Sequence, residues 1–171
     1  SEERTDLLIE KLPLNATSFV ADLGAGTGYF TVPIAKRVVA GRVFAVDLQP
    51  EMLAMIDTRK VNEGLTNIQS VLASETNPGL PESSVDLVLI VDAYHEFTYP
   101  LEVIQQVAAS LKPDGRLYLI EYRGEDPSVP IKPLHKMDEE QAKREMSFAG
   151  LSWVETLDFL PWQHVLVFKR F

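Results

Sequence analysis

The chain has 171 residues, which is enough for one domain with a sizeable core and too few for two ordinary domains. It contains no cysteine, and this excludes disulfides, thiolate metal sites and a cysteine nucleophile. A formal net charge of −9 makes nucleic acid an unfavourable partner, because a phosphate backbone would be repelled.

Composition and hydrophobic patterning are those of an ordinary globular protein. Hydrophobic residues make up 46% of the chain and charged residues 24%. No apolar run approaches the roughly 20 residues that span a bilayer, and no charged-apolar-small leader opens the sequence. The absence of cysteine fits a reducing compartment. We therefore expect a cytoplasmic protein without membrane insertion.

Apolar runs rich in β-branched residues alternate along the chain with stretches of helical spacing. The first half predicts a short amphipathic helix within residues 1–18, a strand at Phe19–Asp22, a helix at Thr27–Val39, a strand at Val43–Asp47, a helix from Pro50 through Ile56, and a strand at Asn67–Leu72. The second half predicts a strand at Val85–Val91, a helix at Pro100–Leu111 that ends at a K-P-D-G turn, a strand at Arg116–Tyr122, a polar segment over Arg123–Pro133, a helix from Asp138 to about Ala149, and two strands at Trp153–Phe159 and His164–Phe168.

This alternation predicts an α/β fold. Strands that alternate with helices form βαβ units with a parallel sheet and right-handed crossovers. The near-continuous apolar run V-D-L-V-L-I-V is typical of a central strand that is covered on both faces. The last two strands leave no room for a helix between them, so they predict a hairpin and one antiparallel strand. We expect a single domain over residues 1–171 with a Rossmann-like, doubly wound, mostly parallel seven-stranded sheet and a C-terminal antiparallel hairpin.

The segment V-A-D-L-G-A-G-T-G-Y-F joins the first strand to the next helix. Its strand ends at Asp22, and glycines occupy the alternate positions Gly24, Gly26 and Gly28. Glycines let a ligand approach the backbone, and free loop N–H groups beside a helix N-terminus offer an anion site. The dinucleotide pattern G-x-G-x-x-G would need its third glycine at Tyr29, which argues against a nicotinamide oxidoreductase. An acid two residues before the first glycine suits a ligand that carries an ammonium group.

A second acid, Asp47, ends the next strand about 20 residues beyond the loop, where a carboxylate accepts hydrogen bonds from ribose hydroxyls. Taken alone, the alternate glycines are explained by a tight turn, and the acid at the end of a strand by helix capping. Both features together, in this order and spacing, favour an amino acid joined to a nucleoside. S-adenosylmethionine, with S-adenosylhomocysteine as its product, is the common ligand of that kind.

These segments resemble the class I S-adenosylmethionine-dependent methyltransferases. The first family motif is matched by residues 20–30, and the second resembles A-V-D-L-Q-P-E-M-L at residues 45–53. S-V-D-L-V-L-I-V-D-A-Y-H-E-F at residues 84–97 is similar to the fourth motif, and L-K-P-D-G-R-L-Y-L-I-E-Y at residues 111–122 to the usual turn and fifth strand. The resemblance is closest to ubiquinone/menaquinone-biosynthesis and arsenite methyltransferase-like proteins of the methyltransferase type 11 group.

The resemblance implies contacts between cofactor and chain at the ends of the first four strands. The implied cofactor-binding residues are Asp22, Gly24, Ala25, Gly26, Gly28, Asp47, Leu48, Met52, Ser74, Glu75, Val91 and Asp92. The glycines would lie against the amino acid part and Asp22 near its ammonium. Leu48 and Met52 would border adenine and ribose, unless they are ordinary helix-face core. Relatives often have an acid after the third strand, and here Ser74 takes that position or Glu75 supplies the acid one residue later.

The cluster D-A-Y-H-E-F lies where an acceptor would be handled. His95 is the best candidate for a general base, because an unperturbed imidazole titrates near 6.5. Asp92 and Tyr94 are candidates for positioning the acceptor, and Glu121 with Tyr122 could face the same cleft. The alternatives are that Tyr94 packs the following helix and that His95 bridges backbone groups.

His135 lies in the segment after the fifth strand, where relatives often line the substrate pocket, and a surface role is its alternative. Asp92, Glu121 and His95 offer atoms that a hard cation could use. However, the pattern of acids found in metal-dependent catechol-type relatives is missing, so no metal site is expected.

A small-molecule acceptor is expected, since the candidate cleft is mixed polar and aromatic and the chain is acidic. A protein or RNA methyltransferase is the alternative, although V-D-A-Y replaces the N/D-P-P-[FYW] signature of amino-directed enzymes. A cofactor-binding module without transfer activity is the third reading. Many relatives carry a longer N-terminal cap than residues 1–18. Either such a cap has been trimmed from this sequence, or the site is open, or another subunit covers it, as in a homodimer.

Overall fold

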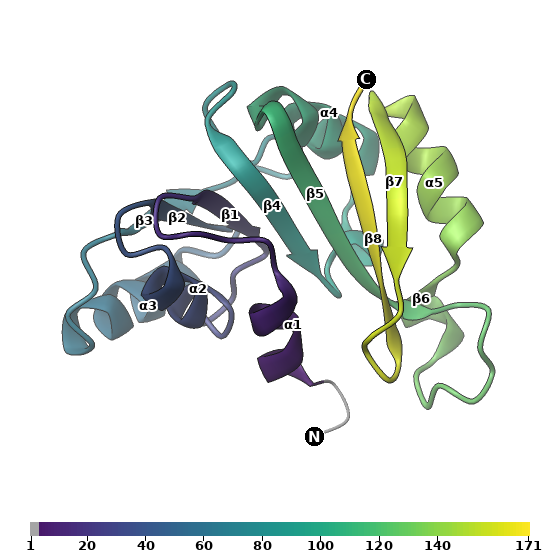
Figure 1. Ribbon diagram of the computed structural model, residues 1–171, viewed down its shortest axis with the longest axis horizontal. Helices are drawn as coiled ribbons and strands as arrows, with labels where there is room; N and C mark the ends of the chain where they lie inside the picture. Colours follow the sequence, from purple (N-terminus) through teal and green to yellow (C-terminus); the bar gives the residue numbers. More distant parts are fainter. Residues whose placement is uncertain (1–3) are drawn as a thin grey trace.

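Eight strands form one sheet in residues 4–171, the part of the chain that the computed structural model describes (Figure 1). They are β1 (Phe19–Leu23), β2 (Arg42–Asp47), β3 (Ile68–Leu72), β4 (Val85–Val91), β5 (Leu111–Arg123), β6 (Lys136–Met137), β7 (Leu151–Leu157) and β8 (Gln163–Arg170). Their order is β3-β2-β1-β4-β5-β8-β7, with β6 paired to β5. The first six strands pair in parallel, whereas β8 is antiparallel to both β5 and β7. The doubly wound sheet and its terminal hairpin are confirmed, and β6 is an eighth strand that the sequence did not predict.

Helices cover both faces of this sheet. They are α1 (Thr5–Lys11), α2 (Thr31–Arg37), α3 (Pro50–Asn62), α4 (Pro100–Ser110) and α5 (Glu139–Phe148), with short 3₁₀ turns η1 (Tyr94–Glu96) and η2 (Pro133–His135). One buried cluster joins α4 and α5 to the sheet, and a second joins α1, α2 and α3 to the other face. The apolar run of β4 lies between these layers, which explains why five of its seven residues are buried.

Most element boundaries differ from the sequence prediction by a few residues, and two of the differences have an evident cause. Helix α2 begins at Thr31 rather than Thr27, because Gly28, inside the predicted range, has a φ of 90°, which no α-helix accommodates. The K-P-D-G sequence does not separate α4 from a later strand, because β5 already begins at Leu111. The extra length of β5 is accommodated by a shift in its register with β4.

The strand order reverses between β1 and β4, since the chain runs outward to β3 and then returns to the other side of β1. In open α/β sheets, ligands bind outside the carboxyl ends of the strands at such a switch point. Residues 73–84, between β3 and β4, form no helix. Among residues 4–171, no helix has the length and apolar content that crossing a bilayer requires.

Candidate active site

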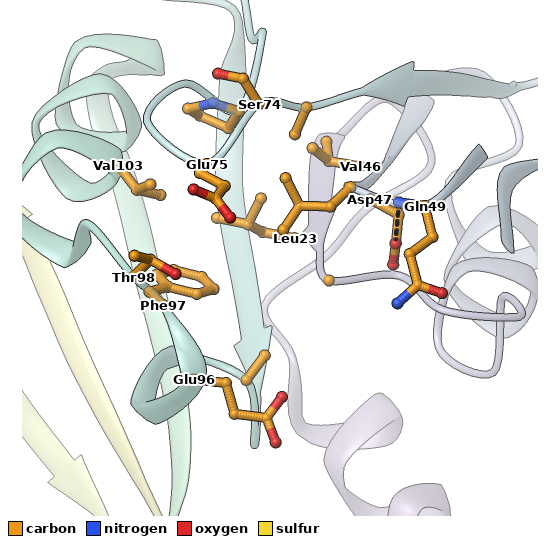
Figure 2. Close-up of a pocket in the computed structure, with 15 residues that line it drawn as sticks. Leu23, Val46, Asp47, Gln49, Ser74, Glu75, Glu96, Phe97, Thr98 and Val103 are labelled. Atoms are coloured by element: carbon orange, nitrogen blue, oxygen red, sulfur yellow. Dashed lines mark hydrogen bonds between the residues drawn. The ribbon is translucent and has the colours of Figure 1, made fainter. Parts of the chain in front are cut away.

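A cavity of about 270 Å³ lies at the carboxyl ends of β1 and β2, beside the segments that follow β3 and β4 (Figure 2). Its walls are formed by Leu23, Gly24, Val46, Asp47, Leu48, Gln49, Ala73, Ser74, Glu75, Pro78, Ala93, Glu96, Phe97, Thr98 and Val103. Five of the predicted cofactor-binding residues are therefore brought together on one cavity: Gly24, Asp47, Leu48, Ser74 and Glu75.

Two backbone amides hold the Asp47 carboxylate in place. The N–H of Gly26 donates to Asp47 Oδ2 at 2.9 Å, and the N–H of Gln49 donates to Oδ1 at 2.9 Å (Figure 2 draws the second bond). Each carboxylate oxygen has a further lone pair, so Asp47 retains the capacity to accept hydrogen bonds from a ligand. A fixed acceptor of this kind suits a pair of sugar hydroxyls.

The glycine loop uses its amides differently from the sequence expectation. The N–H groups of Gly24 and Ala25 both donate to the Val46 carbonyl at 2.9 Å, and the N–H of Gly28 donates to Ala25 at 3.0 Å. The expectation that these amides are free to bind an anion is therefore wrong. The loop instead offers open space, because a Cβ built on Gly26 would have no neighbour within 4 Å. A ligand can approach the backbone there.

Asp22 lies behind this loop and is only 2% exposed. Its Oδ2 accepts a hydrogen bond of 2.6 Å from the Thr31 hydroxyl at the start of α2. Burial raises the pKa of the Asp22 carboxyl to about 6, and the Thr31 hydroxyl acts in the opposite direction. Asp22 does not line the cavity, so a contact with a ligand ammonium stays a prediction.

The segment after β3 supplies the acid that the sequence left open between two positions. Ser74 and Glu75 both line the cavity. The Ser74 hydroxyl accepts a hydrogen bond from the N–H of Asn77, within its own turn. Figure 2 shows the Glu75 side chain pointing into the cavity. Glu75 is therefore the better candidate for the adenine contact.

Several cavity residues were missed by sequence reasoning. They are Leu23, Val46, Gln49, Ala73, Pro78, Ala93, Glu96, Phe97, Thr98 and Val103. Glu96 and Phe97 end the D-A-Y-H-E-F cluster, which indicated this region but not the direction of each side chain. Conversely, six further predicted residues do not line the cavity: Ala25, Gly26, Gly28, Met52, Val91 and Asp92.

The end of β4 has a constrained backbone. Asp92 has a φ of 51°, in the left-handed region that residues other than glycine rarely adopt. The Gln163 side-chain amide, from the start of β8, donates to Asp92 Oδ2. Such strain persists where the surroundings fix it, and it is common at functional sites.

Tyr94 follows in η1 and faces the interior. Its hydroxyl donates to Glu145 Oε1 on α5 at 2.7 Å, and its ring packs edge-on against Phe97. Burial and the neighbouring Glu145 carboxylate raise the pKa of the Tyr94 hydroxyl. The hydroxyl thus bonds to α5 rather than to the following helix α4, and a role of Tyr94 in positioning the acceptor stays a prediction.

His95 connects a buried acid to a second imidazole. Its Nδ1 lies 2.9 Å from Glu121 Oε2, and its backbone N–H donates to Glu121 Oε1 at 3.2 Å. Its Nε2 lies 3.2 Å from His135 Nδ1. The Glu121 side chain is fully buried; burial raises the pKa of its carboxyl, and the hydrogen bond with His95 acts the other way. The structure thus joins three residues that the sequence singled out separately.

A second cavity, of about 300 Å³, adjoins the first, and both are lined by Phe97. The second is lined by Tyr94, His95, Phe97, Pro100, Pro133, Leu134, Lys136, Met137, Gln141 and Glu145. The geometry therefore provides two neighbouring compartments, one with a fixed carboxylate suited to a nucleoside and one beside the His95 ring.

Comparison with known proteins shows the family. The methyltransferase domain family matches residues 21–119, which is more than half of the chain and includes the glycine loop, Asp47 and β4. The chain belongs to the class I S-adenosylmethionine-dependent methyltransferases.

Similarity to individual methyltransferases, in sequence and in structure, supports this assignment. An uncharacterised methyltransferase-like protein of Schizosaccharomyces pombe is 32% identical over 88% of this chain and 56% of its own length. A ubiquinone/menaquinone biosynthesis C-methyltransferase of Hydrogenovibrio crunogenus is 30% identical over 67% of this chain and 46% of its own length. The crystal structure of a SAM-dependent methyltransferase from Aquifex aeolicus superposes with a TM-score of 0.88 at 21% identity, covering 98% of this chain and 89% of the other. This methyltransferase chain spans about half the length of the two curated relatives.

Proposed function

We propose that this methyltransferase binds S-adenosylmethionine in the cavity that contains Asp47 and transfers its methyl group to a small-molecule acceptor. The observation that carries the proposal is the Asp47 carboxylate, which lines the cavity and is fixed by the amides of Gly26 and Gln49. When bound, the cofactor supplies a sulfonium methyl, which an acceptor lone pair takes as the carbon–sulfur bond breaks and its electron pair moves to sulfur.

In this proposal the chain's own residues orient two reactants. Asp47 accepts hydrogen bonds from the ribose hydroxyls, and Glu75 accepts one from the adenine amino group. Asp22 compensates the charge of the ammonium of the amino acid part, and the Thr31 hydroxyl of α2 holds its carboxylate in place. Such alignment supplies about 7–11 kcal/mol of a barrier in favourable intramolecular cases.

The second cavity is the proposed acceptor compartment. His95 lines it, and its ring is oriented by the buried Glu121. In the proposal, His95 handles the proton that an acceptor hydroxyl, thiol or amine loses on methylation. Asp92 and Tyr94 keep this end of β4 in place, through Gln163 and Glu145 respectively.

A screen with methyl-labelled cofactor tests the transfer. Pools of small alcohols, phenols, thiols and amines are offered, and a labelled small product is the expected result. With the acceptor found, His95→Gln should lower kcat about 100-fold and leave S-adenosylhomocysteine affinity unchanged, because general acid–base groups contribute about that much. Glu102→Gln, an exposed change on α4, is the control. Normal turnover of His95→Gln would remove His95 from the reaction, and label on protein or RNA alone would contradict a small acceptor.

A further inference from the structure

Three side chains of metal-binding type lie close together: those of His95, Glu96 and His135. One ligand atom from each lies within 4.8 Å of the other two. The closest pair is His95 Nε2 and His135 Nδ1 at 3.2 Å, with the two rings nearly perpendicular at 76°. The Glu96 carboxylate lies 3.8 Å from His95 Nε2. The histidines come from η1 and η2, which are 40 residues apart in the sequence, so local chain geometry does not explain their meeting.

The spacing suits a small divalent cation. Two imidazole nitrogens bound at about 2.0–2.1 Å in a tetrahedral zinc site are about 3.3–3.4 Å apart. The 3.2 Å between the two ring nitrogens is close to that separation. Two histidines and one glutamate, with a fourth position left open, form a donor set that catalytic zinc sites use.

A second observation, inside the fold, supports the same conclusion. Metal-binding histidines usually donate their other ring N–H to a carboxylate, which fixes the tautomer and aims the free nitrogen at the metal. Glu121 is placed to accept such a bond from His95 Nδ1: its side chain is fully buried, and both of its oxygens contact His95, one at the ring and one at the backbone N–H. A neutral His95 that donates from Nδ1 keeps the Nε2 lone pair for the cluster.

We propose that His95, His135 and Glu96 bind a divalent transition-metal ion of the zinc class, with an open fourth position. Glu96 lines the Asp47 cavity and His95 lines the adjoining one, so the ion would lie at the boundary between them. This departs from the sequence expectation, which considered Asp92, Glu121 and His95 as ligands and found no metal pattern. Glu121 orients the ligand His95 and does not bind the ion itself. His135 was not considered as a ligand from the sequence, because only the fold brings it next to His95.

The open fourth position suits an acceptor with a hydroxyl or thiol group. This assignment of the acceptor rests on the proposed function. With the cation bound, both ring nitrogens of His95 are occupied, so His95 acts as a ligand and not as the base of the proposed function. An acceptor hydroxyl or thiol that binds the cation then loses its proton to solvent, because the cation stabilises the anion. The lone pair on that oxygen or sulfur then forms the bond to the methyl carbon while the carbon–sulfur bond breaks toward sulfur. The product is a methyl ether or a methyl thioether.

Titration with Co²⁺ tests the site on the whole chain. We expect one equivalent to bind with the visible absorption of a low-coordinate cobalt ion. His135→Ala and Glu96→Gln should each weaken binding at least tenfold, and Glu121→Gln about 10–100-fold as a positioning change. Glu102→Gln, exposed and outside the cluster, should bind as the wild type does. Absence of stoichiometric binding, or unchanged affinity in His135→Ala, would overturn the proposal.

A thiol probe tests the open position. The chain has no cysteine, so a thiolate-to-cobalt charge-transfer band can arise only from an added thiol such as 2-mercaptoethanol. Appearance of this band with the Co²⁺ protein, and its loss in His135→Ala, is the expected result; its absence would contradict an open position.

Calorimetry with S-adenosylhomocysteine separates this inference from the proposed function. His135→Ala should lose Co²⁺ but retain wild-type affinity for S-adenosylhomocysteine, since His135 does not line the Asp47 cavity. Cobalt binding without nucleoside binding would refute the proposed function alone. Nucleoside binding without cobalt binding would refute the metal site alone.

Discussion

Two carboxylates at the ends of neighbouring strands have different environments. Asp22 is buried behind the glycine loop, whereas Asp47 lies on the cavity wall and is held by two amides. Their spacing along the chain was enough to predict both as site residues. The burial of Asp22 was not predictable, because it depends on how Thr31 and α2 pack against the end of β1.

The raised pKa of Asp22 predicts a pH-dependent stability. A carboxyl with a pKa of about 6 when folded and 3.8 when unfolded holds its proton longer in the folded state. The unfolded chain loses that proton first, so the free energy of unfolding falls as pH rises from about 4 to 6, by a total of about 3 kcal/mol. Asp22→Asn removes this loss. The free energy of unfolding of the Asp22→Asn variant, minus that of the wild type, should therefore increase by about 1–2 kcal/mol between pH 5 and pH 8.

Urea unfolding of both proteins across this pH range measures the difference. The same variant should lose affinity for S-adenosylhomocysteine at pH 8, where the wild-type carboxyl is ionised. A stability difference that stays constant with pH would contradict the assigned pKa.

At the scale of elements, apolar runs predicted all seven main strands. The runs of β1, β2, β4, β5 and β8 are largely buried, whereas β3 and β7, at the two edges of the sheet, are more exposed. The two-residue strand β6 has no such run, and its pairing with β5 depends on the path of the preceding loop. Likewise, the D-A-Y-H-E-F cluster indicated the end of β4, but the 3₁₀ turn that separates His95, in one cavity, from Glu96, in the other, was not readable from the sequence.

The glycine loop provides a matched pair of substitutions. Both Gly26 and Gly28 have positive φ, but an added Cβ meets nothing at Gly26 and lies 3.1 Å from Ile56 Cγ1 at Gly28. Gly26→Ala should cost about 1–2 kcal/mol of stability from backbone strain alone, and its methyl group should block the ligand. Gly28→Ala should cost about 1–3 kcal/mol more, because Ile56 must also move.

Thermal unfolding and S-adenosylhomocysteine titration distinguish the two variants. Gly26→Ala should be the more stable of the pair and should still bind the nucleoside more weakly than wild type. Full affinity in a folded Gly26→Ala protein would show that the ligand does not approach this backbone.

The whole molecule has two buried clusters, one on each face of the single sheet. The site lies at the edge of the sheet where the parallel strands end. This arrangement leaves the strand ends free for function while the sheet interior supplies stability.

A homodimer stays a prediction, and light scattering of the purified chain tests it.

Phe168 on β8 tests the stabilising layer. It is fully buried in the cluster that joins α4 and α5 to the sheet. Phe168→Ala should lower the free energy of unfolding by about 3–5 kcal/mol, because it removes a large side chain from a packed core. Phe148 is 77% exposed, so Phe148→Ala is the control and should change stability by less than about 0.5 kcal/mol. Similar urea midpoints for the two variants would contradict this packing.

Calorimetric titration of S-adenosylhomocysteine into the wild type, Asp47→Asn and Glu51→Gln tests the central claim most directly. Glu51 is an exposed acid four residues along the chain that does not line the cavity. We expect one equivalent to bind the wild type and Glu51→Gln alike, and Asp47→Asn to bind at least tenfold more weakly, because charge-assisted hydrogen bonds contribute about 1.5–3 kcal/mol each. No binding to the wild type, or equal binding to Asp47→Asn, would contradict the account.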